Sequence, residues 1–409
     1  MKKNGFTLVE LLSIVVILGI IVVVALPQIS GSIGSKKEKQ YNKIVKIVEN
    51  AGKVYLTENV TRDSVSIDKL IKSDYLTSGL KNPINNAPLT GCVKKIISDG
   101  VTKYKYEVDN CPNYLTTYIM DLYDNEETSI ENGLKKDNTP DQNIRYYGSN
   151  PNNYVSFNNE LWRIIGVFGN NVKLVRSEKL GDLSWDSSEE SINAGGGVNE
   201  WSQADLKNYL NTMYYGGTSV TCYGGSKNST TTCPTNTIDE TSKSLIDYHT
   251  WNTGAIEWEK RTDTLAFYND ERGSVNGKIC SSGNNCNDTV TRTTEWPGYI
   301  GLPYATDYAY ASGESICETN MVKKDSSNAY ICKNNNWMFK PNTWYWTLSP
   351  YANTSVACRV WGAYSVGRVP DSIAANGGAV FPTIYLKSNI LIESGKGTSS
   401  DPYILKAGS

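Results

Sequence analysis

MKKNGFTLVELLSIVVILGIIVVVAL, residues 1–26, is the stretch that decides how the chain is organised. A short leader with two lysines ends at Gly5, and an apolar run follows from Phe6 to Leu26. The run is close to the roughly 20 residues that a helix needs to cross a bilayer. One carboxylate, Glu10, interrupts it, and at that depth it costs about 2.5–3.5 kcal/mol on insertion scales. Glu10 should therefore have a partner or a purpose.

Two general explanations of this segment leave Glu10 without a role. A secretory signal peptide would be cut near residues 23–25, where small side chains loosely fit the cleavage rules. A plain single-pass anchor has no use for a carboxylate inside the membrane. Lysines lie on both sides of the span, at residues 2–3 and within 36–39, so charge counting does not assign an orientation.

The order Lys-Lys-Asn-Gly followed by Phe-Thr-Leu-Val-Glu-Leu-Leu closely resembles the prepilin leader of type IV pilins and type II secretion pseudopilins. The resemblance implies that a prepilin peptidase cuts between Gly5 and Phe6, which removes residues 1–5, and methylates the new N-terminus. It also implies that Glu10 pairs with the Phe6 ammonium of a neighbouring subunit, and that Pro27 kinks the helix. A matched charge pair costs less in lipid than an isolated charge.

The segment after Pro27 continues with a helical period. Apolar residues from 44 to 55 recur at helical spacing, which predicts one long helix from Phe6 to about Glu58 with one face to cover. Two alternating segments, 92–97 and 103–108, flank Asp99-Gly100 and predict a hairpin. This order is similar to a small pilin head, so we expect residues 6–113 to form a pilin-like domain.

The remaining chain predicts a linker and a second domain. Residues 114–142 are rich in acidic side chains and suggest a linker, and residues 143–409 suggest a sheet-rich extracellular module. Ser202 could cap a helix in this module. Its expected strands are 153–157, 160–167, 172–176, 344–348, 355–361, 379–386 and 402–405. The predicted fold class is α+β: a long N-terminal helix with a small antiparallel sheet, followed by a larger mixed, sheet-rich C-terminal domain.

Three motifs in the second domain resemble an uncharacterised module of Gram-positive surface proteins. They are Leu-Trp-Arg-Ile-Ile-Gly at 161–166, Tyr-Trp-Thr-Leu-Ser-Pro at 345–350 and Pro-Thr-Ile-Tyr-Leu-Lys at 382–387. The function of that module is not established, so the resemblance does not indicate what the second domain does.

All nine cysteines lie beyond residue 90, in the part that would face outside, which favours an oxidising compartment. A zinc site is the rival explanation, but the spacings give no C-x-x-C knuckle and the chain has a single histidine, His249. We therefore expect no metal, and Cys358 is left over. Proximity in sequence suggests the pairs Cys92–Cys111, Cys222–Cys233, Cys280–Cys286 and Cys317–Cys332.

Several function classes find no support in the sequence. A formal net charge of −2 argues against a nucleic-acid surface. Phosphate-binding, dinucleotide-binding and zinc-protease motifs do not occur, and His249 would have to serve any histidine-based catalysis. We expect neither catalytic residues nor cofactors. Trp337, Trp344 and Trp346 could form a ligand surface on which a sugar stacks, although alternating rings in a core explain them as well.

Together these features predict a minor pilin that sits at a filament tip or occurs rarely and does not form the repeating shaft, and whose C-terminal head contacts a surface glycan or a protein ligand. A pseudopilin of a type II-like secretion or competence system is the alternative, which genomic neighbours would distinguish. A membrane-tethered hydrolase is the third hypothesis. The expected partners are the prepilin peptidase, other pilin subunits and the membrane. The chain would be a single-pass protein of the cytoplasmic membrane before assembly and part of an extracellular filament afterwards.

Overall fold

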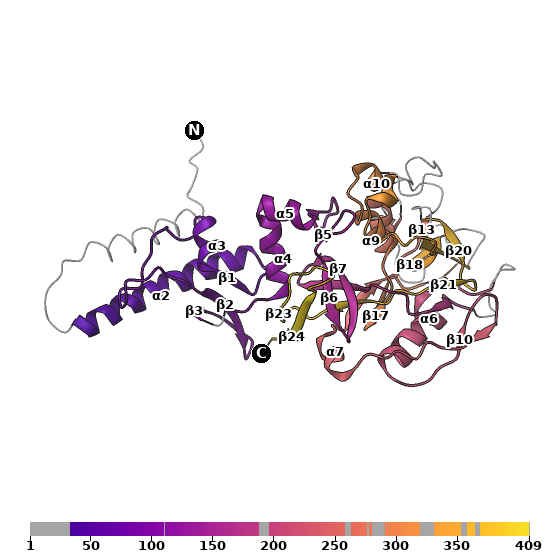
Figure 1. Cartoon of the computed structure of the whole chain (residues 1–409), viewed down its shortest axis with the longest axis horizontal. Helices are drawn as coiled ribbons and strands as arrows, with labels where there is room; N and C mark the ends of the chain where they lie inside the picture. Colours follow the sequence, from indigo (N-terminus) through magenta and orange to yellow (C-terminus); the bar gives the residue numbers. More distant parts are fainter. Residues whose placement is uncertain are drawn as a thin grey trace. The chain divides into compact units, whose positions relative to one another are not determined.

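The computed structural model describes residues 33–408 except 110, 188–195, 258–262, 276–277, 280–289, 291, 320–330, 353–357 and 365–368. The chain forms two compact units, Met1–Asn113 and Tyr114–Ser409. The structure contains helices together with many strands, so the α+β fold class is confirmed (Figure 1).

The first unit packs one helix against a three-stranded antiparallel sheet. Its elements are α2 (Ile33–Glu58), β1 (Ser64–Ser66), α3 (Ile67–Lys72), β2 (Cys92–Ser98) and β3 (Val101–Glu107), with the strand order β1-β2-β3. The apolar face of α2 buries Val48, Ala51 and Tyr55 against the sheet. A Cβ placed on Gly52 would lie 2.4 Å from the Cβ of Val93, so glycine allows the helix its close approach to β2.

A tight turn and a disulfide fix the hairpin of β2 and β3. Ser98 pairs with Val101, and the two residues between them, Asp99 and Gly100, have φ angles of 52° and 74°. Positive φ at both central positions is the geometry of the two-residue turns that suit the twist of a hairpin. Cys92, at the start of β2, is joined to Cys111 with 5.7 Å between the Cα atoms, so the disulfide closes the open end of the hairpin.

The predicted membrane-spanning run from Phe6 to Leu26 lies outside the described residues, and so do Gly5, Glu10 and Pro27. Within the described residues, no helix is both long enough and apolar enough to span a bilayer. The end of the predicted long helix is described: α2 ends at Glu58, where the helical spacing predicts it.

The second unit contains two main sheets and a set of short helices. Its helices are α4 (Leu115–Asp124), α5 (Glu126–Asn132), η1 (Trp201–Gln203), α6 (Asp205–Asn208), η2 (Tyr209–Tyr215), α7 (Glu240–Leu245), α8 (Thr264–Glu271), α9 (Ala305–Tyr310) and α10 (Ser315–Thr319). Outside the two main sheets, short strands form the pairs β10 (Cys222–Tyr223) with β11 (Thr230–Thr231), β12 (His249–Asn252) with β16 (Glu295–Gly298), and β14 (Ser274–Val275) with β15 (Lys278–Ile279).

The larger sheet has the order β17-β22-β8-β7-β6-β24-β23, and β5 and β4 extend it from β7. Its strands are β4 (Leu134–Lys136), β5 (Ile144–Tyr146), β6 (Tyr154–Phe157), β7 (Glu160–Phe168), β8 (Asn171–Arg176), β17 (Ile300–Gly301), β22 (Thr383–Leu386), β23 (Ile390–Ser394) and β24 (Tyr403–Ala407). The centre of the sheet is the local meander of β6, β7 and β8. Asn158 and Asn159 make the first turn with φ angles of 56° and 55°.

The smaller sheet joins strands that are far apart in sequence. It has the order β20-β19-β18-β21-β9, and β13 pairs with β18. Its strands are β9 (Asp182–Ser184), β13 (Ile256–Glu257), β18 (Tyr345–Ala352), β19 (Arg359–Ala363), β20 (Asp371–Ile373) and β21 (Gly377–Ala379). All eight residues of β18 are buried, as expected of a central strand that is covered on both faces.

Residues 114–142 differ from the expected linker. They form α4, α5 and β4, and the structure includes them in the second unit. Leu115 and Ile119 of α4 are fully buried in its core, and α4 contacts β7, β8 and β23. The acidic side chains lie mostly on the exposed face of this segment, so its composition reflects one face and not a separate linker.

Two further local predictions need correction. The predicted strand 379–386 is two strands in different sheets, because β21 ends at Ala379 and β22 begins at Thr383, after Pro382. Proline cannot donate a hydrogen bond to a ladder, which suits a position between strands.

Ser202 does not cap the predicted helix. Glu200 accepts from the backbone of Gln203 instead, and the helical turns that follow carry the buried Leu206 and Leu210.

Two more predicted cysteine pairs are joined in the second unit. Cys222 bonds Cys233 and Cys317 bonds Cys332, with Cα atoms 5.3 Å and 5.7 Å apart. The predicted pair Cys280–Cys286 lies outside the described residues. Cys358 is buried, with 3% of its surface exposed.

Candidate ligand site

The three tryptophans expected to form a ligand surface do not lie together on the surface. Trp337 is 4% exposed and Trp346 is fully buried, so neither ring can stack on a ligand from solution. The indole nitrogen of Trp346 donates to the Leu183 carbonyl at 2.8 Å. Only Trp344, just before β18, is partly exposed. The prediction for Trp337 and Trp346 is therefore wrong, because they are core rings.

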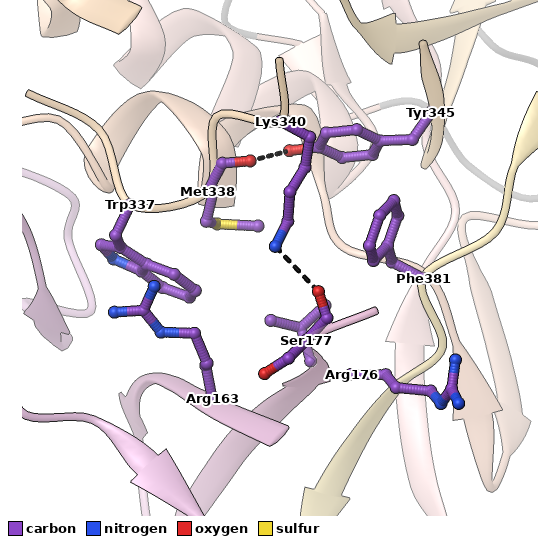
Figure 2. Close-up of a pocket in the computed structure, with 9 residues that line it drawn as sticks. Arg163, Arg176, Ser177, Trp337, Met338, Lys340, Tyr345 and Phe381 are labelled. Atoms are coloured by element: carbon purple, nitrogen blue, oxygen red, sulfur yellow. Dashed lines mark hydrogen bonds between the residues drawn. The ribbon is translucent and has the colours of Figure 1, made fainter. Parts of the chain in front are cut away.

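A small cavity beside Trp337 has no room for a ligand (Figure 2). Its volume of about 10 Å³ corresponds to a single water. The Arg163 guanidinium lies over the Trp337 ring at 4.6 Å, and the Lys340 ammonium donates to the Ser177 carbonyl at 2.8 Å. Burial lowers the pKa of Arg163 to about 10 and also lowers the pKa of Lys340. These cations serve packing within the unit.

Trp344 lines a larger depression that opens to solvent at the strand ends of the smaller sheet. The depression has a volume of about 670 Å³, within the range of about 300–1,000 Å³ usual for small-molecule sites. It is lined by Gly225, Trp344, Tyr364, Pro370, Asp371, Ser372, Asn376 and Gly377. These residues come from the ends of β18, β19, β20 and β21 and from the loop after β10.

Glycines on two strands hold the Trp344 ring in place. A Cβ on Gly362 of β19 would lie 2.3 Å from Cη2 of Trp344, and one on Gly378 of β21 would lie 2.8 Å from its Nε1. The ring therefore rests against backbone where a side chain would otherwise stand. Trp346 contacts it edge-on, with 5.4 Å between the ring centres. On the other side Tyr364, 39% exposed, lies 6.2 Å from the Trp344 ring centre.

Polar groups of β20 and the following turn form the second part of the lining. Asp371 accepts from the Arg359 guanidinium at 2.5 Å through Oδ2. Within the described residues, no hydrogen bond reaches its other oxygen, Oδ1. Asn376 is exposed and donates to the Ser372 hydroxyl at 3.1 Å. The depression thus offers two aromatic rings and adjacent hydrogen-bonding groups.

A cluster of buried charges lies elsewhere in the second unit. Arg145 of β5 bonds Asp137 at 2.6 Å and Asp307 of α9 at 2.8 Å, and Lys173 of β8 bonds Asp307 at 2.5 Å. These side chains are at most 2% exposed. The Lys173 ammonium also lies 4.1 Å from the Tyr304 ring centre. The cluster ties two strands of the larger sheet to α9, and its burial keeps solutes away.

Opposing effects set the pKa values in this cluster. Burial lowers the pKa of Lys173 from 10.5 to about 8, and the attraction of Asp307 limits the drop. Burial alone would raise the pKa of Asp307, but Lys173 and Arg145 outweigh it, so the pKa is lowered. Nearby Glu271 has a raised pKa because burial outweighs its hydrogen bonds from Thr306 and Ser349.

His249, the single histidine, is held by its neighbours. Its ring stacks on Tyr385 with 3.7 Å between centres, and its Nδ1 lies 3.2 Å from Asp247. Burial lowers the pKa of the imidazole, while Asp247 acts in the opposite direction. The stacking gives His249, on β12, a packing role against Tyr385 of the larger sheet.

Sequence reasoning identified Trp344 and missed the other groups of the depression. Tyr364, Asp371 and Asn376 stand in unremarkable segments, and none belongs to a recognisable motif. They come together only because β19, β20 and β21 meet around β18. No sequence signal known to us would have found them.

The comparisons with known proteins concern the N-terminus. Residues 1–26 match the family model of the prokaryotic N-terminal methylation motif. This match supports the resemblance to type IV pilins and pseudopilins. It indicates a pilin- or pseudopilin-type subunit in general: a membrane-anchored precursor that is processed by a prepilin peptidase and assembles with other pilins. No curated protein and no solved structure matches the chain.

Proposed function

We propose that this protein is a minor subunit at the tip of a type IV filament and that its C-terminal head contacts a surface or a ligand. One observation carries the proposal: the methylation motif of residues 1–26 shares a chain with a second compact unit, Tyr114–Ser409. The motif explains assembly into a filament. The second unit, with its open depression, exceeds what assembly requires.

The size of the second unit favours the tip over the shaft. The N-terminal helices of neighbouring subunits in a filament would pack side by side, and packed helices lie about 8–10 Å apart. A unit of this length has an expected radius of gyration of about 19 Å, so its diameter is several times the helix spacing. A head on every subunit would crowd its neighbours along a shaft, whereas a subunit at the tip meets no such crowding. A head at the tip is also the most exposed to a ligand.

We propose no catalytic activity. Lys173, Asp307 and Glu271 are three charged groups with perturbed pKa values, and all three are buried out of reach of a substrate. His249 is stacked on Tyr385. Among the described residues that line the depression, Asp371 is the one acid, and Arg359 already neutralises it. Turnover of glycans or peptides by the purified chain would contradict this part of the proposal.

Immunogold microscopy of intact filaments tests the tip position. An antibody against residues 143–409 should label filament ends, and a labelled major subunit should decorate the whole shaft as the control. Continuous decoration by the first antibody would refute the proposal. Label confined to the cell envelope, with none on surface filaments, would favour the pseudopilin alternative.

A further inference from the structure

We infer that the depression around Trp344 binds a neutral oligosaccharide through stacking on its two rings. This inference rests on the proposed role of the head in ligand contact and names the ligand class. A pyranose ring presents a face of C–H groups and an edge of hydroxyls, and it therefore needs a flat aromatic surface beside hydrogen-bonding groups. The depression supplies both.

The stacking surface is fixed before any ligand arrives. Trp344 lies on Gly362 and Gly378, and Trp346 holds it from the side. The ring has little freedom left to lose, so binding costs little side-chain entropy. Tyr364 stands at 60° to the Trp344 ring, which makes an angled pair that can contact two adjacent sugar units.

The polar groups match hydroxyls. The Oδ1 atom of Asp371 can accept a hydrogen bond, and the amide of Asn376 can both donate and accept. Arg359 fixes the Asp371 carboxylate from behind with its bond to Oδ2. A carboxylate oxygen that is already oriented is a strong acceptor for a sugar hydroxyl.

The charge of the lining separates this ligand from other classes. Among the residues that the structure describes, the lining includes one acid, Asp371, and no lysine, arginine or histidine. Nucleic acids and phosphate-rich polymers need cationic partners, so the depression does not suit them. A quaternary ammonium group favours enclosure by several ring faces. Here two rings stand at an angle in an open depression, which suits a sugar face better.

Binding can be measured on the full chain in a detergent without a sugar headgroup, since a glucoside or maltoside would compete. Maltotriose, cellotriose and chitotriose are the probes, with choline and a polyphosphate as probes of the other classes. Saturation-transfer NMR shows which sugar protons touch the protein, and calorimetry gives the Kd. At least one trisaccharide should bind, with its C–H protons in contact with aromatic protons.

Variants then locate the binding. Tyr364→Ala should raise the Kd about tenfold or more. Tyr364→Phe, which keeps the ring, should bind nearly as tightly as the wild type. Tyr248→Ala is the matched control, because Tyr248 is 59% exposed and lies outside the depression. Trp344→Phe, which keeps a smaller ring, should weaken binding less than Tyr364→Ala if the fold is intact by thermal melting.

The inference is overturned if no trisaccharide binds up to about 10 mM, if Tyr364→Ala leaves the Kd unchanged, or if choline or polyphosphate binds at Tyr364 in place of sugars. These readouts do not depend on filament assembly. If the immunogold label follows the whole shaft but sugars still bind, only the tip proposal fails. If the label is confined to the tip but no sugar binds, only this inference fails.

Discussion

Replacing Asp307 by asparagine tests whether the buried charges hold the second unit together. The change keeps the size of the side chain and removes the charge that faces both Lys173 and Arg145. Arg145 retains Asp137, but Lys173 loses the carboxylate with which it is paired. Breaking a buried pair on one side costs about 3–5 kcal/mol. At about 2–4 °C per kcal/mol, the melting temperature should fall by about 6–20 °C.

The assay is unfolding of the full chain in detergent by heat and by urea, followed by circular dichroism. Asp182→Asn is the matched control, because Asp182 forms a pair of the same length with Lys179, 2.5 Å, but is 57% exposed. That surface pair should contribute less than about 1 kcal/mol. Equally small losses for Asp307→Asn and Asp182→Asn would refute the reasoning.

The loss should also depend on pH and on Lys173. The pKa of Lys173 is about 8 in the folded wild type and 10.5 in the unfolded chain. Between these two pH values the unfolded state binds more protons, so the free energy of unfolding rises with pH. Buried tyrosines such as Tyr304, whose pKa burial raises well above 10, oppose this at higher pH. Without Asp307 the pKa of Lys173 falls further. The loss in Asp307→Asn should then be larger at pH 6 than at pH 9, and adding Lys173→Met should recover part of it.

Three further outcomes are expected. Mass spectrometry of the mature chain should find a start at methylated Phe6, after cleavage behind Gly5; an intact leader would contradict the processing prediction. Glu10→Ala should insert into the membrane as well as the wild type or better but fail to enter filaments, because the carboxylate is useful only with a partner; normal incorporation, measured by filament shearing and immunoblotting, would count against the pairing. Serine at both Cys92 and Cys111 should lower the free energy of unfolding by roughly 3 kcal/mol in denaturant titrations, as expected for a loop with a sequence separation of 19; an unchanged midpoint would show that the bond does not constrain the unit.

Local patterns in the sequence were sufficient for the end of the long helix and for the hairpin of the first unit. The apolar spacing of residues 44–55 placed the helix that ends at Glu58, and Asp99-Gly100 placed the turn of the hairpin. In the second unit the three strands of the meander, β6, β7 and β8, were also predicted, at 153–157, 160–167 and 172–176. Each of these features depends on residues that are close in sequence, where side-chain period and turn chemistry act directly.

Only the tertiary structure decided which tryptophan meets solvent and which residues surround it. Trp344 and Trp346 are two residues apart, yet one lines the depression and the other is fully buried and donates a hydrogen bond to Leu183 of β9. The same holds for Lys173 and Asp307, which meet across a separation of 134 residues. The sequence by itself determined the N-terminal motif and the local elements. Burial and charge pairing were decided by contacts between distant strands, because no local pattern specifies which strand will cover a given side chain.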